Sequence, residues 1–227
     1  MNRINKFPIE ELEAVIFDMD GVLVDSEPVY FKVEKALFKT LNLDISPEVH
    51  RSFVGMSMKM IWKKIKENNK LDLSDEELIS LHKKLMIRGF KSLHKPLPIN
   101  GVIPLLEMLK KNKIKIALAS SSSHELIEVI LSRTGLMSYF PVKVSGDDVS
   151  NGKPEPDIFL RTLELLKSGK NNTLVIEDST NGVTASLNAG ITCAAYDNKS
   201  GGQCVAMADM IFSNFNDFRM FLDREIG

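Results

Sequence analysis

Acidic residues end two short apolar segments of the chain. Asp18 and Asp20 close the stretch LEAVIFDMD, and Glu177 and Asp178 close the stretch TLVIED. One acid at the end of a strand is usually a turn or cap residue, but several acids that meet at one edge repel each other unless a cation neutralises them. An all-oxygen site with few protein ligands suits Mg²⁺, which keeps waters and is completed by a substrate phosphate. These residues therefore indicate a magnesium site that accepts a phosphate.

Two other segments carry donors for an anion. Ser120 follows IALA and opens a run of four serines, and Lys153 lies in the loop sequence GKPEPD. Together with a metal, the two side chains and the backbone N–H groups after Ser120 would bind a phosphate. A carboxylate in such a site can attack phosphorus and form an aspartyl-phosphate. The residues alone thus predict Mg²⁺-dependent phosphoryl transfer through a carboxylate.

The elements that must position these residues alternate along the chain. Apolar runs of strand length lie at 12–18, 114–120, 173–178 and 191–196, and amphipathic segments of helix length lie at 101–112, 123–134, 155–168 and 180–189. Such alternation predicts a parallel sheet covered by helices on both faces. Ligands of such sheets bind at the carboxyl ends of the strands, which is where the acids and Ser120 are expected.

Residues 26–97 interrupt this alternation with several helices and no convincing strand. Ser46 followed by a proline predicts a helix start, and Ser74 with Glu77 predicts a capping box. We interpret 26–97 as a helical insertion between the first and second strands. It carries 14 lysines and arginines against nine acidic residues. Most of these charges are expected on solvated helix faces, and a few cations are expected to face an anionic ligand.

The composition is that of an ordinary globular protein. The 227 residues include 29 basic and 30 acidic side chains, which argues against a globally basic nucleic-acid binder. Cys193 and Cys204 form no CxxC pair and no zinc spacing, so two reduced thiols are expected. The N-terminus resembles no signal peptide, and no apolar run reaches the ~18–20 residues that span a bilayer. We expect a cytoplasmic protein with no membrane or nucleic-acid partner.

Taken together, the motifs resemble those of the haloacid dehalogenase superfamily, in the branch of β-phosphoglucomutase and small sugar-phosphate phosphatases. The motifs occur in order as Asp18-Met19-Asp20-Gly21, Ser120, Lys153 and Glu177-Asp178. The resemblance runs from about Ala14 to Tyr196. It implies a Rossmann-like α/β core formed by 1–25 and 98–227, and a helical cap domain formed by 26–97 that closes over the site.

The resemblance also implies a role for each motif residue. Asp18 would be the nucleophile and a Mg²⁺ ligand, and Asp20 the general acid and later the base, with its main-chain carbonyl on the metal. Asp178 would bind Mg²⁺, with Glu177 as a further ligand or behind the ligands. The transferring phosphoryl group would be held by Ser120, the Ser121 amide and Lys153.

Two departures from the family pattern limit which substrates are expected. The resembling mutase has a histidine at the position of Tyr30 and an arginine at the position of Met58, where this chain has Lys59 next. A distal phosphate would lose its bidentate partner. We therefore expect a phosphatase for a sugar or polyol phosphate, with Tyr30 and Lys59 as cap contacts to the substrate. β-Phosphoglucomutase stays as the alternative.

Other classes fit less well. A receiver domain is about half this length and lacks the helical insertion, and a non-catalytic regulator on the same fold would be expected to lose a motif residue. Asp20 argues against a dehalogenase, because the second acid marks the phosphoryl-transfer branch. We expect a monomer or weak dimer whose partner is a small phosphate ester. Structural or surface roles are expected for His50, His82, His94 and His124.

Overall fold

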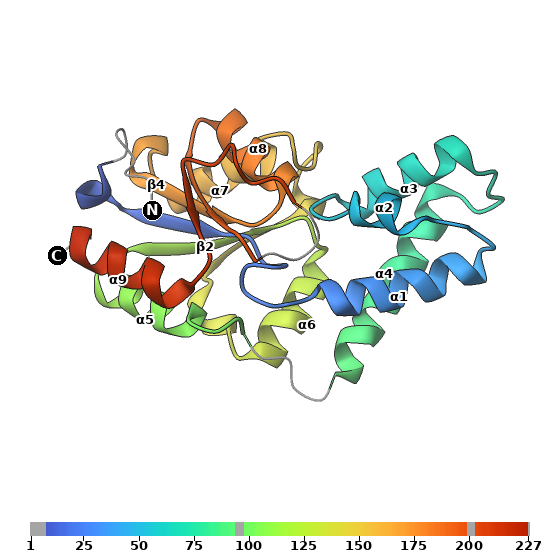
Figure 1. The fold of residues 1–227 in the computed structure, drawn as a ribbon, viewed down its shortest axis with the longest axis horizontal. Helices are drawn as coiled ribbons and strands as arrows, with labels where there is room; N and C mark the ends of the chain where they lie inside the picture. The colour runs from blue at the N-terminus through green and yellow to red at the C-terminus, as the bar shows by residue number, and fades with distance from the viewer. Residues whose placement is uncertain (1–7, 94–97, 199–202, 227) are drawn as a thin grey trace.

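The centre of the molecule is a parallel six-stranded sheet with the strand order β3-β2-β1-β4-β5-β6 (Figure 1). A computed structural model describes residues 8–93, 98–198 and 203–226. The strands are β1 (Ala14–Phe17), β2 (Lys115–Ser120), β3 (Val142–Ser145), β4 (Thr173–Glu177), β5 (Thr192–Tyr196) and β6 (Met210–Phe212). All adjacent pairs are parallel, so the predicted α/β class is confirmed.

Helices cover both faces of this sheet, as the alternation predicts. Along β1, Val15 and Phe17 pack into one buried cluster and Ala14 and Ile16 into another, because successive side chains of a strand point to opposite faces. The first cluster is completed by α5 (Val102–Lys111), α6 (His124–Thr134) and α9 (Phe215–Ile226), and the second by α7 (Asp157–Leu166) and α8 (Thr180–Ala189). The apolar character of the central strands follows from this burial on both sides.

Each of the four apolar runs contains a strand, but two edge strands and the last helix are additional. β3 carries the half-buried Lys143 and β6 has three residues, so neither forms the long apolar run that indicates a buried strand. The helix α9 begins at Phe215. The sheet is therefore wider than the sequence pattern indicates, while its centre is as expected.

Four helices between β1 and α5 form a separate layer beside the sheet (Figure 1), and we call them the cap. They are α1 (Glu27–Thr40), α2 (Pro47–Arg51), α3 (Met58–Asn68) and α4 (Asp75–Ser92). They enclose their own buried cluster around Phe38 and Trp62. Ser46 caps α2, and Ser74 and Glu77 form the predicted capping box at α4. No strand occurs in the described part of the insertion.

The chain enters and leaves the cap at adjacent points. Val24 and Pro98 form an isolated antiparallel bridge, and the Ile99 amide donates to the Leu23 carbonyl over 2.8 Å. The boundary expected at residue 97 lies in 94–97, outside the described residues. None of the helices that the structure describes has the length and apolar character required to cross a membrane.

Candidate active site

The motif residues meet at the carboxyl edge of the sheet because their strands are neighbours in register. Phe17 of β1 pairs with Ile176 of β4, and the Asp18 amide donates to the Ile176 carbonyl over 3.0 Å. Asp18, which follows β1, and Glu177, the last residue of β4, therefore lie side by side. β2 pairs with the other edge of β1 and brings Ser120 to the same end of the sheet.

Lys153 joins two of the acids. Its Nζ donates to Asp18 Oδ1 and to Glu177 Oε1, both over 2.6 Å, and to the Ala119 carbonyl over 3.2 Å. The side chain is 1% exposed. A buried ammonium with three acceptors is fully satisfied, so Lys153 holds the Asp18 carboxylate in one orientation.

Both carboxylate oxygens of Glu177 are engaged. Oε1 accepts from Lys153, and Oε2 accepts from the backbone amides of Asp178 and Ser179 over 2.8 and 2.9 Å. Gly182 packs so closely against this carboxylate that a Cβ there would overlap it. Glu177 therefore fastens Lys153 to the turn after β4.

Gly21 brings the loop after β1 against Asp178. Its φ of +80° lies in the left-handed region, and a Cβ at this position would overlap the Asp178 carboxylate. Glycine alone meets both conditions without strain. The oxygen that Gly21 approaches most closely, Asp178 Oδ2, also accepts from Asn198 Nδ2 over 3.0 Å. Asp178 thus lies in a narrow space next to the loop that carries Asp20.

The cluster has more buried acid than buried base. Burial raises the pKa of Asp18 to about 8, with Lys153 opposing the rise and Glu177 adding to it. Burial, with the Glu177 and Asp18 charges, raises the pKa of Asp178 well above its usual range. A divalent cation would relieve this repulsion. Within the described ranges no three acidic, histidine or cysteine side chains form a metal cage, but Mg²⁺ needs only one or two carboxylates beside water and phosphate oxygens. Asp18 and Asp178 fit that requirement.

Two of the four serines at the end of β2 line a cavity, and a third lies beneath them. Ser120 is fully buried, and its Oγ accepts from the Ser122 amide over 3.1 Å. Ser121 and Ser122 line the cavity. Ser121 Oγ donates to the Gly55 carbonyl over 3.3 Å, so this loop also touches the cap.

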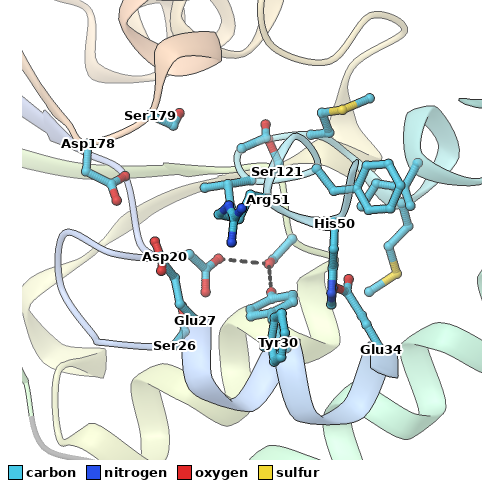
Figure 2. A pocket seen from close by; sticks show the side chains of 18 of the residues that line it. Asp20, Ser26, Glu27, Tyr30, Glu34, His50, Arg51, Ser121, Asp178 and Ser179 are labelled. Atoms are coloured by element: carbon cyan, nitrogen blue, oxygen red, sulfur yellow. Dashed lines mark hydrogen bonds and ion pairs between the residues drawn. The ribbon is translucent and has the colours of Figure 1, made fainter. Parts of the chain in front are cut away.

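The cavity lies between the core and the cap and has a volume of about 480 Å³. Asp18, Asp20 and Asp178 line its core side, and Figure 2 shows the last two. On its cap side, Tyr30 and Glu34 come from α1. The volume lies within the range of small-molecule sites, ~300–1,000 Å³. The acids therefore face a partly open cavity of the size of a small ligand.

Two hydroxyl groups form a hydrogen-bonded chain that ends at Asp20. Ser122 Oγ donates to Asp20 Oδ2 over 3.1 Å and lies 2.9 Å from Tyr30 Oη (Figure 2). Asp20 Oδ1 is buried and has no hydrogen-bond partner among the described residues. Burial raises the pKa of Asp20 above its usual range. Its two oxygens therefore have different surroundings.

A second buried charged cluster lies in the cap. His50 Nε2 and Glu34 Oε2 are 2.5 Å apart, and His82 Nε2 lies 3.1 Å from Glu34 Oε1. Burial raises the pKa of Glu34, but the two histidines outweigh it and hold the pKa below its usual range. All three residues line the cavity. Their spacing along the chain follows no local pattern, so the sequence gives no signal for this cluster.

The cap cation that lines the cavity differs from the one expected. Of the two expected cap contacts to the substrate, Tyr30 lines the cavity, whereas Lys59 is exposed and is not among the lining residues. Arg51, at the end of α2, lines the cavity instead and is drawn in Figure 2. His124 is exposed and pairs with Asp148 over 2.8 Å, which confirms its surface role. His94 lies outside the described residues.

Comparison with known proteins identifies relatives of matching length. The model of the haloacid dehalogenase-like hydrolases matches residues 15–196. A phosphorylated carbohydrates phosphatase of Thermotoga maritima is 37% identical over 184 residues, covering 79% of this chain and 82% of that protein. A β-phosphoglucomutase of Bacillus subtilis is 28% identical over 223 residues, covering 94% and 95%. The crystal structure of β-phosphoglucomutase from Clostridium difficile is 26% identical, with a TM-score of 0.81 over 94% of this chain and 98% of that one.

Proposed function

The chain belongs to the haloacid dehalogenase-like hydrolase family, and from its site we propose that it hydrolyses the phosphate ester of a small sugar or polyol through a phosphorylated Asp18. It is an enzyme that acts on phosphate esters. One observation carries the proposal: Asp18, fixed by Lys153, and Asp20, held by Ser122, line the same cavity.

In the first half-reaction, Asp18 attacks the phosphorus atom. Lys153 holds Oδ1, which leaves Oδ2 to form the new bond as the bond to the ester oxygen breaks. Asp20 gives its proton to that oxygen, and the sugar or polyol leaves as the alcohol. Ser120 and the Ser121 amide are the proposed donors to the phosphoryl oxygens, and the ammonium group of Lys153 is proposed to attract these oxygens by its charge.

In the second half-reaction, Asp20 acts as a base. Its carboxylate takes a proton from water, the water oxygen bonds to phosphorus, and the bond to Asp18 breaks to release inorganic phosphate. We propose that Asp18, Asp178 and the main-chain carbonyl of Asp20 hold Mg²⁺. When bound, the metal would neutralise charge on the phosphoryl oxygens. Because both Glu177 oxygens are engaged, we assign Glu177 to anchoring Lys153 and not to the metal.

The cap supports a polyhydroxylated substrate. Glu34 presents an ionised carboxylate at the cavity wall, and a carboxylate has about four acceptor positions, of which the hydrogen bond from His50 takes one. The remaining positions can accept hydrogen bonds from hydroxyl groups. Apolar Phe31 and Met56 line the same cavity, as is common around the carbon face of a bound ligand.

A second candidate, a phosphomutase, is favoured by one observation. The arginine that the mutase resemblance places at Met58 is missing, but Arg51 from α2 lines the cavity and could supply a planar fork for a distal phosphate. Its side chain is half exposed and pairs with Glu48 over 3.3 Å. A half-exposed arginine would bind a distal phosphate only weakly, so we propose hydrolysis in preference to the mutase reaction.

To decide between phosphatase and phosphomutase, a panel of phosphate esters is assayed in Mg²⁺ for released phosphate. β-Glucose 1-phosphate with its 1,6-bisphosphate is assayed in parallel for conversion to glucose 6-phosphate. We expect release from sugar or polyol phosphates to be faster than any isomerisation. If isomerisation is much faster than the hydrolysis of every ester, the chain is a phosphomutase and the phosphatase proposal is wrong.

A further inference from the structure

Ser122 occupies a position that none of the motif roles explains. It is the third residue of the serine run, it is buried, and its hydroxyl lies between a core acid and a cap phenol. Asp20 follows β1 in the core, whereas Tyr30 belongs to α1 in the cap. Ser122 therefore connects two residues that come from different layers of the molecule.

The number of protons on each group fixes the direction of the two hydrogen bonds, between Tyr30 and Ser122 and between Ser122 and Asp20. A serine hydroxyl has one proton and two acceptor positions. The proton of Ser122 is donated to Asp20 Oδ2, because a carboxylate oxygen can only accept. Tyr30 must then donate to Ser122 Oγ over the 2.9 Å that separates them. The chain of donation runs from Tyr30 to Ser122 to Asp20.

The phenol stays a donor in this setting. Burial, with the Asp20 charge adding to it, raises the pKa of Tyr30 well above its usual value. The neutral hydroxyl therefore keeps its proton, and the chain of donation keeps its direction. It ends on one oxygen of Asp20, since the other oxygen, Oδ1, is buried without a partner among the described residues.

The difference between the two oxygens of Asp20 suits a carboxyl group that must first give a proton and then take one. A carboxyl group whose Oδ2 is held by a hydroxyl donor can carry its proton only on Oδ1. The bond from Ser122 is acceptable in both states, because Oδ2 is an acceptor in the neutral acid and in the carboxylate. Neither hydroxyl has to turn when the proton leaves or returns.

We propose that Ser122 and Tyr30 are positioning residues that fix Oδ2 of Asp20 and so aim Oδ1 at the reacting oxygen. The inference rests on the proposed function. In the first half-reaction the proton passes from Oδ1 to the ester oxygen as the bond between that oxygen and phosphorus breaks. In the second, Oδ1 takes a proton from the attacking water. Because Tyr30 lies on the cap, Asp20 is aligned when α1 lies against the serine loop as it does here.

The test uses three phosphate monoesters of one ring, the 2,4-dinitrophenyl, 4-nitrophenyl and phenyl esters. Their leaving groups become steadily more basic and need proton donation more. The measured quantity is kcat/KM in Mg²⁺, because it covers the steps up to phosphorylation of Asp18 and excludes the later role of Asp20 as a base. The variants are Ser122→Ala, Tyr30→Phe and the double variant.

We expect Ser122→Ala to leave the dinitrophenyl ester within about threefold and to slow the phenyl ester ~10–100-fold, a part of the whole general-acid effect. Tyr30→Phe should follow the same trend more weakly. The double variant should lose no more than Ser122→Ala, because both hydroxyls act through one bond to Asp20.

Ser123→Ala is the matched control. Ser123 is the next residue, is equally buried, and its hydroxyl has no hydrogen-bond partner in the described chain. It should leave all three esters unchanged. An equal loss across the three esters in Ser122→Ala, or no loss at all, overturns the positioning role alone. A wild-type protein that hydrolyses neither these aryl esters nor any sugar or polyol phosphate overturns the proposed function and the positioning role with it.

Discussion

Two buried charged clusters face the same cavity, and they are built in opposite ways. In the core a cation, Lys153, lies between two acids, Asp18 and Glu177, at 2.6 Å from each. In the cap an acid, Glu34, lies between two histidines at 2.5 and 3.1 Å. The core cluster, with Asp178 beside it, has excess negative charge and attracts a cation, and a bound cation would in turn attract a phosphate. In the cap cluster the single acid, Glu34, is held by the histidines, and its carboxylate still offers hydrogen-bond acceptors to a ligand.

This difference separates two tasks. In the proposed function the core cluster holds the groups that make and break bonds, so a change there should affect every substrate. The cap cluster is proposed to contact the part of the ligand that does not react, so a change there should affect some substrates more than others. Variants in each cluster, compared on the same esters, test this division.

The largest effect is expected from Asp18→Asn. The amide keeps the shape of the side chain but is not a nucleophile, so turnover of every ester should fall by about three orders of magnitude or more. Released phosphate is the measurement. Near-normal hydrolysis by the purified variant would remove Asp18 from the mechanism.

Next in size is the loss of stability in Lys153→Met. The substitution leaves Asp18 and Glu177 buried without their cation, so unfolding in urea with chelator present should show a loss of about 3–5 kcal/mol. Lys83→Met is the matched control. Lys83 pairs with Asp147 over 2.8 Å between cap and core, but both side chains are partly exposed, so at most about 1 kcal/mol is expected. Equal losses would contradict the burial argument.

Mg²⁺ should stabilise the protein more in mild alkali than in acid. The folded state holds a proton on Asp18 up to about pH 8, whereas the unfolded chain releases it near pH 4. The folded state binds more protons between these values, so stability without metal falls as pH rises through this window. Metal binding removes that loss. At about 100 times Kd, Mg²⁺ adds ~2.7 kcal/mol, so the Tm should rise by about 5–10 °C at pH 8 and hardly at all at pH 5. A scanning fluorimetry shift that is equal at both pH values would contradict this account.

A smaller and selective effect is expected from Glu34→Gln. The change removes the charge in the cap and keeps the shape, so kcat/KM for a sugar phosphate should fall about tenfold, which corresponds to ~1.4 kcal/mol. The small aromatic ester 4-nitrophenyl phosphate has no hydroxyls for Glu34 to bind, and its rate should stay within about twofold. Glu48→Gln removes the same charge from an exposed position of the same cap and should change neither rate. A parallel fall for both esters would assign Glu34 to cap stability.

The smallest effect distinguishes two cations of the cap. Arg51→Ala should raise KM for an anionic sugar substrate about threefold, because its half-exposed charge is screened by salt, while Lys59→Ala should leave KM unchanged. Steady-state kinetics at low ionic strength measures both. A larger effect at Lys59 would favour the expectation from sequence over the cavity lining.

The sequence predicts the core cluster well, because its residues follow strands that pair in order. An apolar run that ends in Asp18 and another that ends in Glu177 need only a parallel sheet to become neighbours. The edge strands β3 and β6 are not predicted, since three or four residues with a lysine or an exposed side chain form no buried run. They widen the sheet without changing its centre.

The cap cluster could not be predicted in the same way. Glu34, His50 and His82 come from three helices, and the packing of those helices around Phe38 and Trp62 decides which polar side chains meet. Helical periodicity gives the inner face of each helix but not the register between helices. Lys59 was expected near the substrate by its neighbourhood in sequence, whereas Arg51 reaches the cavity because α2 ends there.

The bridge between Val24 and Pro98 has a consequence for how such an enzyme can change over evolutionary time. Because the two ends of the cap lie next to each other, a longer, shorter or entirely different segment can join them without altering the register of any core strand. Loop-closure entropy also grows only slowly with the length of an insertion. A gene encoding this core can therefore acquire a new substrate range by replacing one contiguous stretch, while the residues that handle phosphate are inherited unchanged.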